Sequence, residues 1–153
     1  MTFDIRQDDL SGPEIQALLR EHLAGMQADT PPESVHALPL EALRHPDITL
    51  WSVWREGALC GCGALKKLDA HHGELKSMRT HRDFLRQGVS QALLTHILAH
   101  ARRIGLQRLS LETGTHASFA PAHALYRRNG FEDCGPFGAY RPDPHSLFMT
   151  RRV

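Results

Sequence analysis

The chain has 153 residues, of which 41% are hydrophobic and 23% are charged. This size and balance predict one globular domain over residues 1–153 and exclude a disordered chain, a collagen and a disulfide-stabilised miniprotein. Lys and Arg (18) nearly balance Asp and Glu (17), so the formal net charge of +1 lacks the basic excess of a general nucleic-acid binder.

The expected compartment follows from two absences and a cysteine count. No apolar run approaches the ~20 residues of a membrane helix, and the first ten residues hold no signal-peptide core. Three cysteines in a chain without a secretory signal favour free thiols over disulfides. We therefore expect a cytoplasmic protein with neither a membrane nor a nucleic acid as partner.

The first half of the chain predicts strands and one helix. Apolar residues recur at helical spacing after Gly12-Pro13, with Ser11 as the cap, and Thr30-Pro31-Pro32 ends this helix. Residues 34–46 form a predicted loop with one short helical turn at 40–43. Four segments have the pattern of strands, the middle two joined as a hairpin: residues 2–6, 48–54, 58–68 and 74–80.

The second half alternates strands with helices. One apolar stripe predicts a helix from Val89 to Ile104, ended by Gly105, and residues 119–129 predict another helix. The remaining predicted strands are residues 107–113, 131–137 and 147–152. A strand–helix–strand unit implies a parallel pair with a right-handed crossover. The expected fold class is α/β of the α+β type, with a mixed sheet of about six to seven strands flanked by helices.

The segment that carries chemistry is a strand followed by a basic turn and a helix. Gly88 opens this helix, and a glycine permits close approach of the backbone to a ligand. A helix N-terminus presents unpaired N–H groups that suit a phosphate. Three arginines add local positive charge: Arg79, Arg82 and Arg86. The alternative is an ordinary turn with solvated arginines, and no Walker or dinucleotide-binding motif is present.

Together with Ala124-Leu125-Tyr126-Arg127-Arg128-Asn129-Gly130-Phe131, this strand, turn and helix resemble the GNAT superfamily of N-acetyltransferases. The resemblance covers roughly residues 48–153, and the order of elements extends it over nearly the whole chain. It implies a GNAT fold with splayed central parallel strands, and an acyltransferase that moves the acetyl group of acetyl-CoA directly to an amine. Leu85 stands where the family has Arg or Gln, and Ser90 where it has a last small residue.

The resemblance also implies where acetyl-CoA binds. The cofactor would lie where strands 74–80 and 107–113 splay apart, with a backbone N–H near Met78 polarising the acetyl carbonyl. The pantetheine arm would pair with the backbone of Met78 and Thr80, and backbone amides of residues 86–91 would bind the pyrophosphate. The implied cofactor-binding residues are Met78, Arg79, Thr80, Arg86, Gln87, Gly88, Val89, Ser90 and Gln91.

Acetyl transfer to an amine needs a proton donor and a proton acceptor. A primary amine has a pKa of about 10.4, so it must lose a proton before it attacks. By the resemblance, Tyr126 is the general acid for the departing thiolate; the alternative is a core tyrosine with a satisfied hydroxyl. Glu74 is the candidate base, against the alternative of a solvated carboxylate at a strand end.

Other bases and other functions stay open. Glu112 rivals Glu74 as the base, although a structural pair with Lys76 on the neighbouring strand is the favoured reading of Glu112. His72 and His116 could also serve, because histidine titrates near neutral pH. No metal is expected, since His96 and His100 fall on the polar stripe of their helix.

The acceptor is predicted only as a class. It is a small-molecule or peptide amine, in a site shaped by residues 30–46 and 137–145, the least regular parts of the chain. An alternative function is a GNAT-fold module that binds CoA, or regulates, without turnover. A homodimer is left open.

Overall fold

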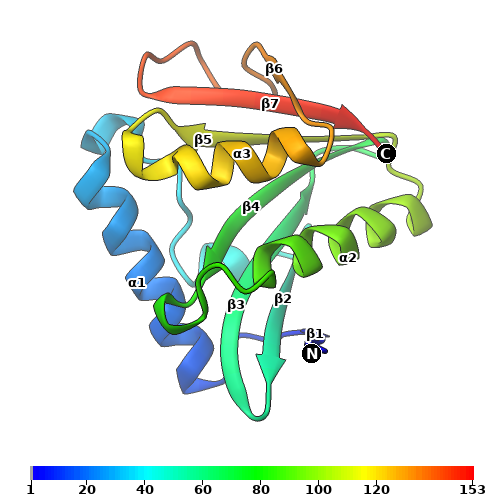
Figure 1. Cartoon of the computed structure of the whole chain (residues 1–153). Helices are drawn as coiled ribbons and strands as arrows, with labels where there is room; N and C mark the ends of the chain where they lie inside the picture. Colours follow the sequence, from blue (N-terminus) through cyan, green and yellow to red (C-terminus); the bar gives the residue numbers. More distant parts are fainter. Residues whose placement is uncertain (1) are drawn as a thin grey trace.

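A computed structural model describes residues 2–153 of the protein, so residue 1 of the predicted domain lies outside the described residues. The described residues form a sheet of seven strands in the order β1-β2-β3-β4-β5-β7-β6 (Figure 1). The strands are β1 (Asp4–Gln7), β2 (Ile48–Arg55), β3 (Ala58–Lys67), β4 (His72–Thr80), β5 (Arg108–Gly114), β6 (Glu132–Cys134) and β7 (Ser146–Arg152). The α-helices are α1 (Pro13–Asp29), α2 (Val89–Arg103) and α3 (Ala120–Arg128). Short 3-10 helices lie at Pro32–Ser34, Ala42–Arg44, Arg82–Phe84 and Ala117–Phe119.

The sheet is mixed, as the sequence predicts. β4 and β5 pair in parallel, and every other neighbouring pair is antiparallel. The connection between β4 and β5 contains α2, which is the crossover helix that a parallel pair requires. The predicted α+β fold class is confirmed.

Residues on the two faces of the sheet enter two different cores. Trp51 and Leu65 belong to a cluster that includes the buried stripe of α2 and residues of α3. Their neighbours Leu50 and Ala64 belong to a second cluster, with the buried residues of α1. This alternation follows from the period of two along a strand. The sheet therefore separates α2 and α3 from α1.

β4 and β5 stop pairing before either strand ends. Their ladder runs from His72 opposite Arg108 to Leu75 opposite Leu111, although β4 continues to Thr80 and β5 to Gly114. Figure 1 shows the two strands together at one end and apart at the other, with α1 beside the open end. The predicted splay of the central parallel strands is confirmed.

A bulge in β4 accompanies this separation. The pairing of β3 with β4 shifts register between Cys62 and Ala64. Opposite this shift, Ser77 has φ 55, in the left-handed region that non-glycine residues rarely adopt. A bulge bends its strand and increases the local twist, which turns the end of β4 away from β5.

Two local predictions were wrong. The strand predicted to reach Phe137 ends at Cys134, because Gly135 and Pro136 follow and proline has no N–H for a ladder. The first helix begins at Pro13 with Gly12 as its N-cap, while the hydroxyl of Ser11 donates to Asp9 at 2.6 Å instead of capping the helix. The short turn expected near residues 40–43 is present at Ala42–Arg44.

Gly63 should not tolerate a side chain. A Cβ there would lie 2.4 Å from the sulfur of Met78 and 2.9 Å from Leu93. Overpacking of this kind typically costs about 1–3 kcal/mol, so we expect Gly63→Ala to lower the free energy of unfolding by that amount in a denaturant titration. Gly135→Ala is the matched control, because a Cβ at Gly135 meets nothing within 4 Å. Equal stability of the two variants would contradict the packing described for β3.

Candidate functional site

A cleft opens where β4 and β5 separate. Its volume is about 810 Å³, and parts of β4, β5 and all three helices line it, together with residues 34–37. Most residues predicted as catalytic or cofactor-binding line it: Glu74, Met78, Arg79, Thr80, Arg86, Gly88, Val89, Ser90, Gln91 and Tyr126. Gln87 is the exception; its side-chain oxygen accepts a hydrogen bond from Arg55 at 2.5 Å.

The entry to α2 presents free N–H groups to this cleft. Arg86 has φ 61 and Gly88 has φ 83, so the backbone turns in left-handed geometry just before the helix. The N–H of Ala92 bonds the carbonyl of Gly88 at 3.0 Å, and the N–H groups of residues 89–91 therefore precede the first helical bond. Such a turn concentrates donors and partial positive charge, which suits an anion.

The three arginines near this turn are not equivalent. Arg79 and Arg82 both point toward Glu21 of α1, with nitrogen–oxygen distances of 3.9 and 3.8 Å. Arg86 is exposed and has no ion pair among residues 2–153. Within the described chain, Arg86 thus keeps its whole charge for a ligand, whereas the other two are partly neutralised.

Tyr126 of α3 is buried against the helix side of the cleft. Its ring packs edge-on to Phe131, with 5.7 Å between ring centroids, and the residue is 6% exposed. Within residues 2–153 its hydroxyl has no hydrogen-bond partner, so the alternative of a core tyrosine with a satisfied hydroxyl does not describe it. Burial raises the pKa of Tyr126 well above its ordinary value, and the hydroxyl stays protonated at neutral pH.

Glu74 is held in a buried cluster instead of being solvated. Tyr140 donates its hydroxyl to Glu74 Oε2 at 2.5 Å, and Lys76 Nζ donates to the same oxygen at 3.0 Å. Lys76 also donates to the Tyr140 oxygen at 3.2 Å, which closes the triangle. Glu74 is 4% exposed. Burial and the Glu74 charge raise the pKa of Tyr140 far above its ordinary value.

The predicted pair between Lys76 and Glu112 is wrong. Lys76 binds Glu74, two residues earlier on the same face of β4, and Glu112 instead accepts a hydrogen bond from the Ser146 hydroxyl at 2.7 Å. The cause is the separation of the strands, since Lys76 and Glu112 fall just beyond the last paired residues, Leu75 and Leu111. Burial raises the pKa of Glu112, which Ser146 opposes by hydrogen bonding.

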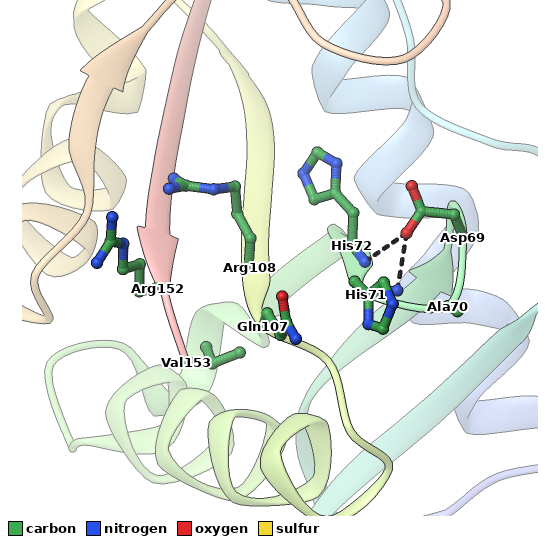
Figure 2. Close-up of a pocket in the computed structure, with 8 residues that line it drawn as sticks. All are labelled: Asp69, Ala70, His71, His72, Gln107, Arg108, Arg152 and Val153. Carbon is green, nitrogen blue, oxygen red and sulfur yellow. Dashed lines mark hydrogen bonds between the residues drawn. The ribbon is translucent and has the colours of Figure 1, made fainter.

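The two histidines considered as bases lie outside the cleft lining. His116 caps a short helix through the N–H of Ser118 and is exposed. His72 contacts Ser110 at 2.7 Å and lines a different hollow, of about 740 Å³, beside Arg108 and Arg152 (Figure 2). This hollow holds none of the residues predicted as catalytic or cofactor-binding.

Sequence reasoning missed Tyr140 and His36. Both line the cleft, and their rings meet edge-on with 5.0 Å between centroids. Ser34 and Asp143 join the same two segments by a hydrogen bond of 2.6 Å. The sequence did mark residues 30–46 and 137–145 as the irregular segments near the acceptor, but nothing local in either segment signals which side chains turn inward.

The described residues hold no cluster of metal ligands: within residues 2–153, no group of three or more His, Cys, Asp and Glu side chains could hold a metal ion. His96 and His100 instead pack edge-on to Trp51, at 6.0 and 4.9 Å between ring centroids. No helix formed by the described residues combines the length and apolar character that crossing a bilayer requires.

Known proteins are similar to this chain over most of its length. The model of the acetyltransferase (GNAT) family matches residues 14–131. The uncharacterized N-acetyltransferase YedL of Escherichia coli is 54% identical over 148 residues, which cover 97% of this chain and 93% of that protein. The uncharacterized N-acetyltransferase YsnE of Bacillus subtilis is 53% identical over 149 residues, with coverage of 97% and 99%.

Solved structures share the architecture. A protein of Klebsiella pneumoniae assigned as an acyl-CoA N-acyltransferase has a TM-score of 0.80 at 28% identity, with coverage of 99% of this chain and 97% of that one. A GNAT family acetyltransferase from Elizabethkingia anophelis, solved with acetyl-CoA bound, has a TM-score of 0.68 at 16% identity and coverage of 99% and 98%. The fold and the relatives define this protein as an acyltransferase. The chain belongs to the acetyltransferase (GNAT) family.

The two tyrosines of the chain should differ in what their hydroxyls contribute to stability. Tyr140→Phe removes two hydrogen bonds and leaves buried Glu74 with Lys76 alone. A buried polar group that loses its partner costs about 1–3 kcal/mol, so we expect the free energy of unfolding to fall by that amount. Tyr126→Phe is the matched control and should unfold close to the unmodified protein. The reverse order in a denaturant titration would contradict this view of the cluster.

Proposed function

We propose that the protein transfers the acetyl group of acetyl-CoA directly to the amine of a small-molecule or peptide acceptor, in a ternary complex. One observation carries the proposal: the donor-rich turn before α2 opens into the same cleft that the separation of β4 and β5 creates. Membership of the GNAT family and the acetyl-CoA bound in a structural neighbour support it.

The free edge of β4 would receive the pantetheine arm. Beyond Leu75, β4 has lost its ladder with β5, while its other edge still pairs with β3 through Arg79 and Thr80. The unpaired backbone groups near Met78 can therefore bond the amides of the arm, and an N–H there can polarise the acetyl carbonyl. The pyrophosphate would bind the N–H groups of residues 86–91.

The proton chemistry would be divided between the two faces of the sheet. Tyr126, which packs with the α2 and α3 cluster, would protonate the departing thiolate. A carboxylate on the α1 face would accept the proton of the incoming ammonium, and Glu74 is the residue that the sequence nominates. We also propose a reducing compartment such as the cytoplasm, because the cysteines are free: Cys60, Cys62 and Cys134.

Acetyl-CoA should stabilise the protein, and Gly88 should be needed for it. At 100 times Kd a ligand adds about 2.7 kcal/mol, so acetyl-CoA should raise Tm while NAD and ATP should not. Gly88→Val should weaken binding in a calorimetric titration, since valine resists φ 83 and blocks close approach to the turn.

Gly57→Val is the matched control for that variant. Gly57 has φ 78 with open space around it, and it lies in the β2–β3 hairpin, away from the cleft. It should show similar backbone strain with unchanged affinity. An unchanged melting curve of the unmodified protein at millimolar acetyl-CoA would refute the cofactor assignment.

Tyr126→Phe should slow turnover without weakening the binding of acetyl-CoA. General acid catalysis typically contributes about 10²–10⁴-fold, so kcat should fall by that factor. Thiol release would be followed with a panel of primary amines, amino acids, amine-bearing antibiotics and peptides. Acetyl-CoA affinity should hold, because the hydroxyl matters once the thiolate leaves. Full activity of the variant would leave Tyr126 a packing residue, and binding without thiol release by the unmodified protein would indicate a CoA-binding module.

A further inference from the structure

A second hollow lies apart from the cleft, at the end of the sheet where β4 and β5 still pair (Figure 2). The turn between β3 and β4, the start of β5 and the end of β7 line it, and it shares no lining residue with the cleft. Its volume is about 740 Å³. Sites for small molecules typically have volumes of about 300–1,000 Å³. The hollow therefore has room for a small molecule of its own.

Three basic side chains lie side by side across this hollow. The register places His72 of β4 opposite Arg108 of β5, and Arg108 opposite Arg152 of β7. Residues directly opposite on neighbouring strands share a face of the sheet. Figure 2 shows the three side chains on their three strands. Like charges directly opposite each other destabilise an antiparallel pair, so the two arginines repel one another unless an anion lies between them.

The protein itself does not neutralise these arginines. Neither Arg108 nor Arg152 is ion-paired with a carboxylate of residues 2–153. Among the described residues, Asp69 is the only acidic side chain of the lining. Its carboxylate accepts the backbone N–H groups of His71 and His72, both at 2.8 Å, and so closes the turn before β4. Both guanidinium groups are thus left with their charge available to a ligand.

A network of hydroxyl groups fixes the floor of the hollow. His72 Nε2 contacts the Ser110 hydroxyl at 2.7 Å, and Ser110 contacts the Thr150 hydroxyl at 2.9 Å. Arg108 donates to the same Thr150 oxygen at 3.0 Å. The network joins β4, β5 and β7, and it orients the imidazole and one guanidinium before a ligand arrives. Side chains held in this way lose less conformational freedom on binding.

The chemistry of the hollow fits a phosphate group. A guanidinium can donate two parallel hydrogen bonds to a phosphate or a carboxylate. Two guanidinium groups with an imidazole beside them match the double charge of a phosphate better than the single charge of one carboxylate. The basic set is confined to one hollow and does not form the extended stripe of a nucleic-acid binder. A small molecule that carries a phosphate is therefore the ligand that this site favours.

We propose that the hollow formed by His72, Arg108 and Arg152 binds the phosphate group of a small molecule, at a site separate from the acetyl-CoA cleft. The two guanidinium groups hold the phosphate oxygens from β5 and β7, and the imidazole borders them from β4. The rest of the molecule lies against the turn between β3 and β4. This inference does not depend on the proposed acetyl transfer.

Calorimetric titration with pyrophosphate tests the site. The titration is made at about 0.15 M NaCl, where charges more than ~8 Å apart at the surface are screened, and with saturating acetyl-CoA in the cleft. We expect the unmodified protein to bind pyrophosphate under these conditions. Arg108→Gln and Arg152→Gln should each weaken this binding about 10-fold or more, because each removes hydrogen bonds to a charged group. Arg20→Gln, at an exposed position of α1 outside both hollows, is the matched control and should bind normally.

Thermal unfolding separates a binding role of Arg152 from a structural one. In phosphate-free buffer of low ionic strength, Arg152→Gln should have the Tm of the unmodified protein or a higher one, because it removes the repulsion from Arg108. Added pyrophosphate should raise Tm of the unmodified protein more than that of Arg152→Gln. A lower Tm of the variant without pyrophosphate, with an equal rise on its addition, would make Arg152 a structural residue and refute the site.

The titration has further outcomes that decide the proposal. Equal affinity of Arg108→Gln, Arg152→Gln and the unmodified protein would overturn it. Loss of pyrophosphate binding at about 0.15 M NaCl would overturn it too, since only general surface attraction would remain. If acetyl-CoA displaces the pyrophosphate, the binding belongs to the turn before α2, and the second site is refuted. If acetyl-CoA does not bind but pyrophosphate binds in an arginine-dependent way, the second site stands and the proposed function fails.

Discussion

The end of the β4–β5 ladder after Leu75 and Leu111 is the constraint on which the site depends. A continuous parallel pair would satisfy its own backbone groups and leave no cavity between the strands. The bulge at Ser77 turns β4 aside, and Gly63, opposite the bulge, leaves room for the Met78 sulfur. Backbone groups that lose strand partners need others. The opening therefore exposes donors and acceptors at the position where a peptide-like ligand could bond them.

The sheet also divides the cleft into two chemically different sides. On the α2 and α3 side, the donor-rich turn at Gly88 and the buried Tyr126 ring lie together. On the α1 side lie Glu74, Lys76 and Tyr140, which hydrogen bonds join to one another. The β6–β7 loop reaches this side only because β7 runs antiparallel beside β5 and returns the chain to the cleft. This topology would allow the two substrates of the proposed transfer to enter the cleft from different sides.

The sequence predicted those elements whose structure depends on residues near one another in the chain. The strand–turn–helix around Gly88 and the helix carrying Tyr126 depend on near neighbours, and both formed as expected. The Glu74–Tyr140 contact joins residues 66 apart in sequence, and no periodicity encodes it. The Lys76–Glu112 prediction failed because it extended a parallel ladder that in fact ends one residue earlier. Strand separation is a tertiary property, and it decided which charges meet.

The two tyrosines of the chain show how burial alone fails to identify a role. Both have a pKa raised by burial, and both rings pack against phenylalanine. The Tyr140 hydroxyl donates a hydrogen bond to Glu74 and accepts a hydrogen bond from Lys76. A buried tyrosine hydroxyl usually has such partners. Tyr126 has no such partner in the described chain, yet it lines the cleft. A side chain needed only for packing at that position would be served by a phenyl ring. The unbonded hydroxyl at the cleft therefore supports Tyr126 as the proposed proton donor. A hydroxyl that makes no hydrogen bond to the protein can donate its proton to a ligand.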